Sequence, residues 1–290
     1  MLTLTAPTDV PLLRGAIVLC LLAIPITLLL LSIDRRVLDD EALWLKPLKF
    51  HLSLAIHGAT VLIAARFLPE AWANHGIVKT GLFAFGAVII YESLFLSLQA
   101  GRGVRSHFND ATVFDAVGGT IMAAGAGVLV AVPLLLGVAL AVATLRGGVA
   151  GIAANPLPLA LALGFILAGW LGAQTGGAIG ANGGPFVGVD PSAGRFMPLT
   201  GWSLAGGDYR ISHFLGVHAM QAVPLAALAL LAVLPAATVA ALTLPLAAGW
   251  AGLTLMALAR AAVGLPPPLP NPPPAPPPPL PPSISKGSTQ

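Results

Sequence analysis

Several ionisable side chains of this sequence lie within stretches that are otherwise apolar enough to enter a lipid bilayer. Charged residues make up 9% of the 290 residues, and hydrophobic residues make up 57%. An ionisable group at membrane depth is costly, so such a residue normally faces a protein interior and marks a functional site. The residues that predict a site of this kind are Lys46, Lys49, His51, His57, Glu92, Asp115, Arg210, His213 and His218.

Histidines and carboxylates give this predicted site its chemistry. Neutral imidazole binds metal ions and haem iron, and it also exchanges protons near neutral pH. The candidate metal or haem ligands are His213, His218, His57 and His107. Glu92 and Asp115 are the candidate catalytic groups, which would transfer protons or orient the imidazole rings.

Basic and amide side chains near the same positions are candidates for binding an anionic group, such as a haem propionate. These cofactor-binding candidates are Arg102, Arg105, Arg210, Lys49 and Gln221. We also expect Arg210 to pair with Asp115 or Glu92, because a buried charge needs an opposite charge close by.

Seven long apolar segments are expected to carry these residues. A transmembrane helix needs about 20 mostly apolar residues. The segments are 13–33, 48–68, 77–99, 111–143, 156–174, 209–232 and 236–262. The predicted fold class is an all-α, polytopic transmembrane helical bundle of about seven spans, with a tilt or kink in the fourth at Pro133.

The alternating direction of seven spans brings polar residues of different spans to one depth. We call side S the membrane side that holds the connections after the first, third and fifth spans. With a rise of about 1.5 Å per residue, His57, Glu92, Asp115 and His218 are all expected to lie at a similar distance from side S. Side S holds ten lysines and arginines against four on the other side, which favours a cytoplasmic side S and C-terminus in a bacterial inner membrane.

Three polar strings surround the candidate residues, at 44–51, 99–110 and 208–221. Asp208 is expected to cap the sixth span, and Ser106 or Asn109 the fourth. The glycine-rich stretch 174–207 is expected to be a long loop on side S, either a lid that covers the site or a disordered segment.

Together these strings resemble W-L-K-P-x-K-F, Q-A-x-R-G-x-x-S-H-F-N and H-F-x-G-x-H-A-x-Q of a bacterial family of multi-pass membrane proteins that has no known activity. The resemblance covers roughly residues 40–225. It implies the membrane fold and the polar site, and it implies no reaction.

Composition separates a transmembrane domain, 1–264, from a proline-rich tail, 265–290. Thirteen of the 17 residues from Pro266 to Pro282 are proline, so the tail is expected to be disordered or extended. It is a candidate for binding a partner protein.

The single cysteine, Cys20, excludes an intrachain disulfide and a cysteine metal site. The net charge of +3 is spread over the loops, so no nucleic-acid partner is expected.

Four function classes fit these features. The first is a redox protein that binds haem b or a divalent metal and exchanges electrons with a membrane partner. The second is a proton-coupled transporter with Glu92, Asp115 and His218 as the relay. The third is a metal-dependent intramembrane hydrolase, because Ser53 and His57 resemble the ceramidase and adiponectin-receptor superfamily, although His213 and His218 are five residues apart and not four. The fourth is a structural or assembly subunit.

Overall fold

The computed structural model describes residues 10–39, 41–188, 196–197 and 199–268. Six of its helices are long and apolar enough to cross a membrane, and a bent helix pair brings the number to seven if the pair is one span. The described chain is therefore an all-α polytopic bundle, as the apolar segments predict. Most of the proline-rich tail lies outside the described residues, which end at Pro268.

The helices and two short hairpins follow one another in this order. The helices are α1 (Pro11–Ile33), α2 (Leu45–Ala65), α3 (Glu70–Ala73), α4 (Gly76–Arg102), α5 (Val113–Arg146), α6 (Gly148–Ala154), α7 (Leu157–Ala181), α8 (Tyr209–Val217), α9 (Ala219–Leu231) and α10 (Ala236–Ala262). The strands are β1 (Val37–Leu38), which pairs antiparallel with β2 (Glu41–Ala42), and β3 (Phe186–Val187), which pairs antiparallel with β4 (Gly207–Asp208).

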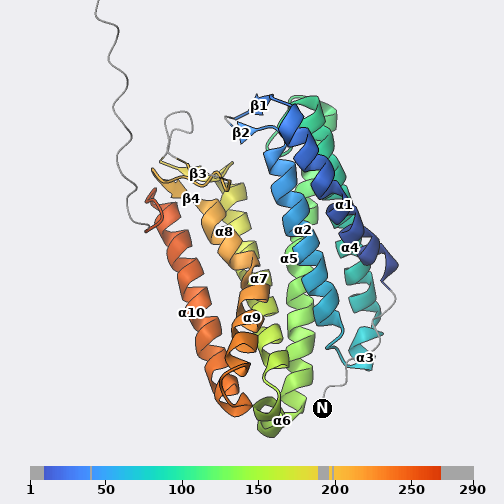
Figure 1. The fold of residues 1–290 in the computed structure, drawn as a ribbon, viewed down its shortest axis with the longest axis vertical. Helices are drawn as coiled ribbons and strands as arrows, with labels where there is room; N and C mark the ends of the chain where they lie inside the picture. Colours follow the sequence, from blue (N-terminus) through green and yellow to red (C-terminus); the bar gives the residue numbers. More distant parts are fainter. Residues whose placement is uncertain (1–9, 40, 189–195, 198, 269–290) are drawn as a thin grey trace, which may run out of the picture.

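The long helices run side by side, with both hairpins at one end of the bundle and α3 and α6 at the other (Figure 1). The hairpin end is side S, because the connections after α1, α4 and α7 lie there.

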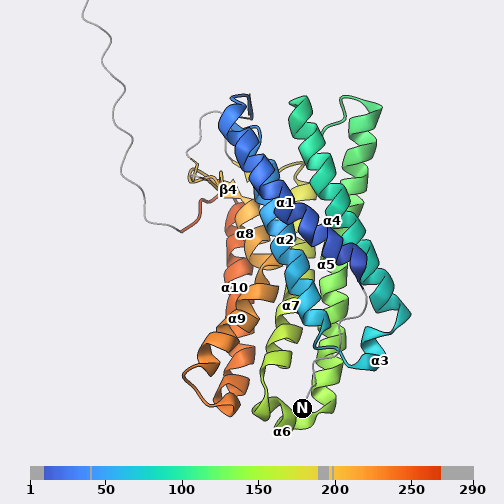
Figure 2. The ribbon, with the colours of Figure 1, turned by 45° about the vertical axis from the view of Figure 1, so that its right-hand side comes forward.

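Helices α1, α2 and α4 pack on one another, and α4 packs on α5. Helices α8, α9 and α10 pack on one another and on α7. We call α1–α5 the N-terminal group and α7–α10 the C-terminal group. The two groups meet mainly where α5 packs along α7. Figure 2 shows α1 crossing obliquely over α2 and α4 on the outside of the N-terminal group.

Two glycines let backbones approach closely on both sides of α7. A Cβ at Gly137 of α5 would lie 2.6 Å from the backbone nitrogen of Ile166 in α7. A Cβ at Gly164 of α7 would lie 2.8 Å from the carbonyl oxygen of Ala219, at the start of α9. Small residues at such crossings are typical of helix packing within membranes, where dispersion contacts between close backbones take the place of the hydrophobic effect.

The sixth predicted span, 209–232, is formed by a bent helix pair. Helices α8 and α9 meet at His218 with an angle of 54° between them. Two residues with unusual backbone requirements flank the bend. Gly216 packs against the backbone of Leu171, and Pro224 lacks the N–H that a regular helix would use.

Helix ends differ from the expectation in two further places and agree with it in one. Neither Ser106 nor Asn109 caps α5, because Thr112 does so, with its hydroxyl accepting from the Asp115 N–H at 3.1 Å. The expected cap at Asp208 is confirmed, with its carboxylate accepting from the Arg210 N–H at 3.0 Å. The loop expected from residue 174 starts only after Ala181, because α7 continues that far.

Candidate functional site

The Asp115 carboxylate stabilises the turn between α4 and α5. Its side chain is 2% exposed and lies 2.5 Å from the guanidinium of Arg102. It also accepts from the Gln99 amide at 2.8 Å and from the Thr112 hydroxyl at 2.6 Å. With three donors around one carboxylate, the charge is compensated as a buried ion pair requires. This arrangement identifies Asp115 and Arg102 as structural anchors.

The Arg210 side chain is fixed by Asp208, two residues earlier in the sequence. Its Nε and Nη2 donate to the Asp208 carboxylate at 2.9 and 2.6 Å, and the same Nη2 also donates to the carbonyl of Gly201. The expected pair of Arg210 with Asp115 or Glu92 is therefore wrong. Arg210 pairs with Asp208 because the helix cap already places the Asp208 carboxylate beside the first turn of α8.

Ion pairs on side S also fix the segments that surround the bundle end. Arg105 pairs with Asp39 at 2.5 Å, and this hydrogen-bonded partner raises the pKa of the arginine. Lys49 of α2 pairs with Glu41 at 3.0 Å and donates to the carbonyl of Thr200 at 3.3 Å. The second contact of Lys49 joins the N-terminal group to the segment that precedes α8.

A further charge pair stabilises the turn that follows α1. Asp34 accepts from the guanidinium of Arg36 at 2.7 Å and from the indole N–H of Trp44 at 2.8 Å. These donors favour the ionised carboxyl and hold the pKa of Asp34 well below its usual range.

The ammonium of Lys46 contacts a neutral side chain, the imidazole of His107. Its ammonium lies 3.3 Å from Nδ1 of His107 in the α4–α5 connection. Burial, and then the neighbouring Lys46 charge, lower the pKa of His107 to about 3, so His107 is neutral at physiological pH. The imidazole accepts a hydrogen bond but does not balance the charge of Lys46. Among the described residues, Lys46 has no carboxylate within 4.0 Å.

Glu92 lies deeper in the N-terminal group and lacks the partners that Asp115 has. Its side chain is 4% exposed, and it makes no hydrogen bond to any residue that the structure describes. Its Oε1 faces Gly125 of α5, where a Cβ would lie 3.3 Å away. Lys46 is close enough to interact with it electrostatically. An unpaired carboxylate in such a place is costly, and binding of a proton or a cation removes that cost.

His213 is fixed in one tautomer by a threonine of α7. The Thr175 hydroxyl donates its only hydrogen to the Leu171 carbonyl at 2.7 Å, so it can only accept from His213. Nδ1 of His213 lies 3.0 Å from this oxygen and therefore carries the proton. The lone pair of His213 is consequently on Nε2.

His218 is fixed by a similar chain that crosses between the two helix groups. The Thr60 hydroxyl of α2 donates to the Ile56 carbonyl at 2.8 Å and accepts from the Gln221 amide at 3.0 Å. The Gln221 oxygen then accepts from Nδ1 of His218 at 3.2 Å. Nε2 of His218 therefore carries the lone pair as well.

His57 of α2 completes a group of three histidines with His213 of α8 and His218 at the bend between α8 and α9. Its Nε2 donates to the Leu129 carbonyl of α5 at 3.3 Å, which leaves the lone pair on Nδ1, and its ring stacks on Phe85. His57 is close enough to both His213 and His218 to interact with them electrostatically. We call these three residues the three-histidine region. Each of them offers one unprotonated ring nitrogen, which can accept a proton or bind a metal.

The predicted site residues thus fall into two places. Asp115, Arg102, Arg105, Arg210, Lys49 and His107 lie on side S, whereas Glu92, His57, His213, His218 and Gln221 lie deeper. Asp115 does not share the depth of Glu92, because Glu92 faces Gly125, ten residues or about 15 Å further along α5. No group of three or more His, Cys, Asp or Glu in the described residues is arranged to hold a metal ion.

Sequence reasoning missed the two threonines that set the histidine tautomers. Thr60 and Thr175 lie in apolar helices, where a threonine commonly bonds only to its own helix backbone. His51, which is not among the candidate ligands, joins three helices. Its Nδ1 lies 3.0 Å from Thr27 of α1, and its Nε2 lies 3.2 Å from Ser97 of α4.

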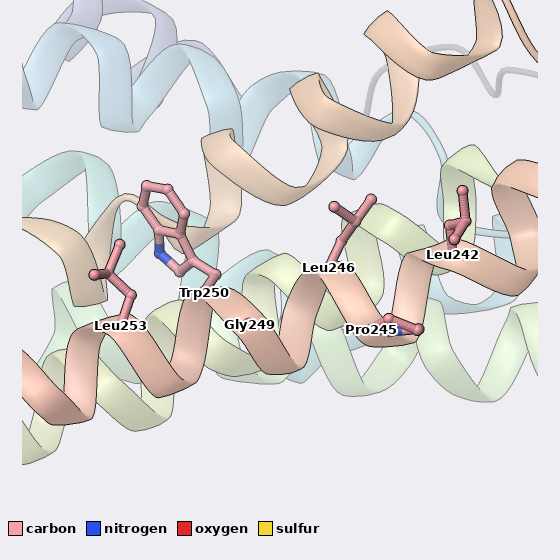
Figure 3. Close-up of a pocket in the computed structure, with 6 residues that line it drawn as sticks. All are labelled: Leu242, Pro245, Leu246, Gly249, Trp250 and Leu253. Atoms are coloured by element: carbon pink, nitrogen blue, oxygen red, sulfur yellow. The ribbon is translucent and has the colours of Figure 1, made fainter.

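A shallow apolar groove on α10 lies apart from these polar groups (Figure 3). Trp250 forms part of its wall and is fixed by a 2.8 Å hydrogen bond from its indole N–H to the Leu215 carbonyl of α8. The six lining residues are Leu242, Pro245, Leu246, Gly249, Trp250 and Leu253. Because no ionisable side chain lines it, the groove offers no group for acid–base or metal chemistry.

Comparison of the chain with known protein families, curated proteins and solved structures finds no match. The resemblance of the three polar strings to a bacterial membrane family stays a prediction. The polar groups within the bundle are therefore the basis for inferring a function.

Proposed function

We propose that this multi-pass membrane protein is a proton-coupled carrier, with Glu92 as its proton-binding residue. One observation supports this most strongly: Glu92 is 4% exposed and has no hydrogen-bond partner among the described residues. A polar residue that only holds helices together is expected to be satisfied, as Asp115 is by Arg102, Gln99 and Thr112. An unsatisfied acid within a membrane protein is the kind of group that proton-coupled transport uses.

The bend between α8 and α9 supplies the element that would move. Broken helices near the middle of the membrane are common at the binding sites of secondary transporters. His218 lies at the 54° bend, and its chain through Gln221 reaches Thr60 on the opposite helix group. The three-histidine region would relay the proton between Glu92 and the far side, because each ring has one nitrogen ready to accept it.

A pH jump on protein reconstituted into liposomes tests this function without knowledge of the substrate. On a solid-supported membrane, wild-type protein is expected to give a transient current as Glu92 takes up a proton. The Glu92→Gln variant cannot bind a proton and should give no such current. Glu70→Gln is the matched control, because Glu70 is an exposed carboxylate in α3 at the far end of the bundle. Equal currents in wild type and Glu92→Gln, or none in wild type, would overturn the proposal.

A histidine-bound haem or metal cofactor is a second candidate, favoured by the three unprotonated nitrogens of the three-histidine region. An absorption spectrum and elemental analysis of the purified protein test it. A Soret band that shifts on reduction, or one equivalent of metal that is lost in His218→Ala, would support a redox or hydrolytic cofactor. A colourless, metal-free protein that still gives the proton current would exclude the cofactor and support the carrier function.

The orientation of the carrier in a bacterial inner membrane follows from the excess of basic residues on side S, which we propose faces the cytoplasm. A reporter fused after Pro268 tests this. Fluorescence of green fluorescent protein would support the orientation, whereas activity of a periplasmic phosphatase would contradict it.

A further inference from the structure

A short segment on side S reaches from one helix group to the other. It comprises residues 199–203, which precede α8, and we call it the strap. Lys49 of α2 donates to the Thr200 carbonyl of the strap at 3.3 Å. Glu41, the ion-pair partner of Lys49, places its carboxylate where a Cβ at Gly201 would lie. The N-terminal group therefore touches the strap through these two side chains.

The C-terminal group holds the strap by several contacts at the start of α8. The Ser203 N–H donates to the Asp208 carboxylate at 2.9 Å, and both residues are buried. Arg210 donates to a carbonyl of the strap. The Trp202 ring meets the Phe214 ring edge-on, with 5.4 Å between the centroids. The strap is therefore a part of the C-terminal group that extends over to the N-terminal group.

The contact between the strap and Lys49 is weaker than the contacts that anchor the strap to α8. The Lys49 and Glu41 side chains are each about one-third exposed, so water screens their charges. The Asp208 side chain, in contrast, is fully buried beside its Arg210 partner. If the two helix groups separate at side S, the contacts of Lys49 and Glu41 break first and the strap stays with α8.

The other contacts between the groups lie deeper in the bundle. Among the described residues, the bond from Lys49 to the strap and the bond from Gln221 to Thr60 are the two hydrogen bonds that join the groups. Thr60 is eleven residues, or about 16 Å, further along α2 than Lys49. A Cβ at Gly169 of α7 would lie 2.8 Å from the Val130 carbonyl, about 25 Å from the side-S end of α5. Separation at side S can pivot on these deep contacts.

A chain of packed rings connects the strap to the bend between α8 and α9. The Phe214 ring, which touches Trp202 of the strap, also lies 4.3 Å from the ring of His218. Nδ1 of His218 then donates to Gln221, which bonds to Thr60. The strap and the deep hydrogen bond between the groups therefore belong to one connected set of contacts, with the bend between them.

From these contacts we propose, resting on the carrier function above, that the strap and Lys49 form the side-S gate of the carrier. When Lys49 releases the strap, the two helix groups separate at side S about the packing of α5 on α7. This movement opens the three-histidine region towards side S. Rocking of one rigid helix group against another is the usual form of alternating access in secondary transporters.

Distances between spin labels at side S test this gate. Double electron–electron resonance is measured on the full-length protein in liposomes, with Cys20 replaced by alanine. The labels are attached to Ile33→Cys at the end of α1 and Val263→Cys after α10, where both positions are exposed. Lys49→Met should raise the ratio of long to short distances about two- to fivefold, as expected for the loss of a weak, partly exposed interaction. Lys49→Arg keeps the charge and the donors and should match wild type.

An ion pair on the same side provides the matched control. Arg105 pairs with Asp39 within the N-terminal group, so Arg105→Met should leave the distance ratio unchanged. Glu41→Gln removes the carboxylate that positions Lys49 and should raise the ratio in the same direction as Lys49→Met. This variant tests the same contact if Lys49→Met does not fold.

A second pair of labels follows the strap itself. Leu199→Cys in the strap and Val233→Cys after α9 are both exposed positions of the C-terminal group. The distance between them should be the same in wild type and in Lys49→Met, because the strap stays with α8. A change in this distance would mean that the strap moves alone, and it would overturn the proposed separation of the helix groups.

Two further results would overturn the gate: a distance ratio that neither Lys49→Met nor Glu41→Gln changes, or an equal change in Arg105→Met. The proton current separates this gate from the proposed function. If wild type gives the current but Lys49→Met leaves the distances unchanged, the carrier function stands and the gate fails. If the distances respond as expected but no current arises, the gate stands and the proton-carrier function fails.

Discussion

The Thr60 hydroxyl of α2 accepts a hydrogen bond from the Gln221 amide of α9 at 3.0 Å, across the two helix groups. Helix α2 packs mainly on α1 and α4, so this contact connects it to a part of the bundle on which it does not otherwise pack closely. The same chain continues through Gln221 to His218 at the bend. The position of the bend and the tautomer of a site histidine are therefore linked through one threonine.

Thr60→Val is expected to lower the stability of the protein by about 1 kcal/mol, because it leaves the Gln221 amide without its acceptor. Thr60→Ser keeps the hydroxyl and should behave like wild type. Thermal unfolding of both variants in detergent measures the difference. If the two unfold at the same temperature, the hydrogen bond between the groups does not contribute to stability.

The buried pair of Arg102 and Asp115 should be much more sensitive to substitution than a surface pair. Arg102→Met leaves a carboxylate that is 2% exposed without its cation, and we expect a loss of about 2 kcal/mol. This is at the low end for a buried pair, because the Arg102 side chain is 35% exposed and water screens the charge.

Arg36→Gln is the control for this substitution, because the Arg36 side chain is 52% exposed and pairs with an exposed cation contribute little. The double substitution Arg102→Met with Asp115→Asn should recover part of the loss, since it removes the unpaired charge. Chemical or thermal unfolding of the set tests this. Losses that simply add in the double variant would contradict direct coupling.

Glycines of α7 provide a matched test of close packing at the bend. Gly164→Ala places a Cβ 2.8 Å from the Ala219 carbonyl and should lower the unfolding temperature, because backbone atoms cannot move aside. Gly177→Ala, in the same helix, meets nothing within 4 Å and should raise it, by up to about 1 kcal/mol in stability. Both variants replace glycine by alanine within α7, so the gain in helix propensity is common to them. A difference in the sign of the stability change therefore reports on packing alone. Equal effects would show that α7 does not pack closely on the bend.

The membrane fold could be predicted from the sequence, because a run of about 20 apolar residues determines a transmembrane helix by itself. The cap at Asp208 was predictable for a similar reason, since capping depends on residues within one turn. The bend at His218 was not, because it coincides with contacts that only the folded bundle makes, such as Gly216 against Leu171 of α7.

The candidate site was predictable in its residue types but not in its pairing. Residue spacing predicted that His57 and His218 lie at a similar depth, and in the structure the two rings are close enough to interact electrostatically. It could not distinguish Asp115, which has three hydrogen-bond partners, from Glu92, which has none among the described residues, because hydrogen bonding depends on the helix ends and on the Thr112 cap. That difference, and not the presence of an acid, separates the structural anchor Asp115 from the proposed proton site Glu92.

Acid should destabilise the protein through His107. Its pKa is lowered to about 3 in the folded protein, against about 6.5 in the unfolded chain, because the ring is buried next to the Lys46 charge. Below pH 6.5 the unfolded chain therefore binds a proton that the folded protein does not. The stability contributed by neutral His107 is complete above pH 6.5 and falls as the pH decreases towards 3, by at most about 1.4 kcal/mol per unit.

His107→Gln should reduce this acid sensitivity, because glutamine can accept from Lys46 but does not titrate. The unfolding temperature of both proteins, measured from pH 7.5 to pH 4, gives the comparison, and the wild-type curve should fall more steeply. His75→Gln is the control, because His75 is an exposed residue at the start of α4, at the other end of the bundle. Parallel curves for wild type and His107→Gln would mean that His107 takes up its proton without unfolding, and the ring would then not be a neutral acceptor for Lys46.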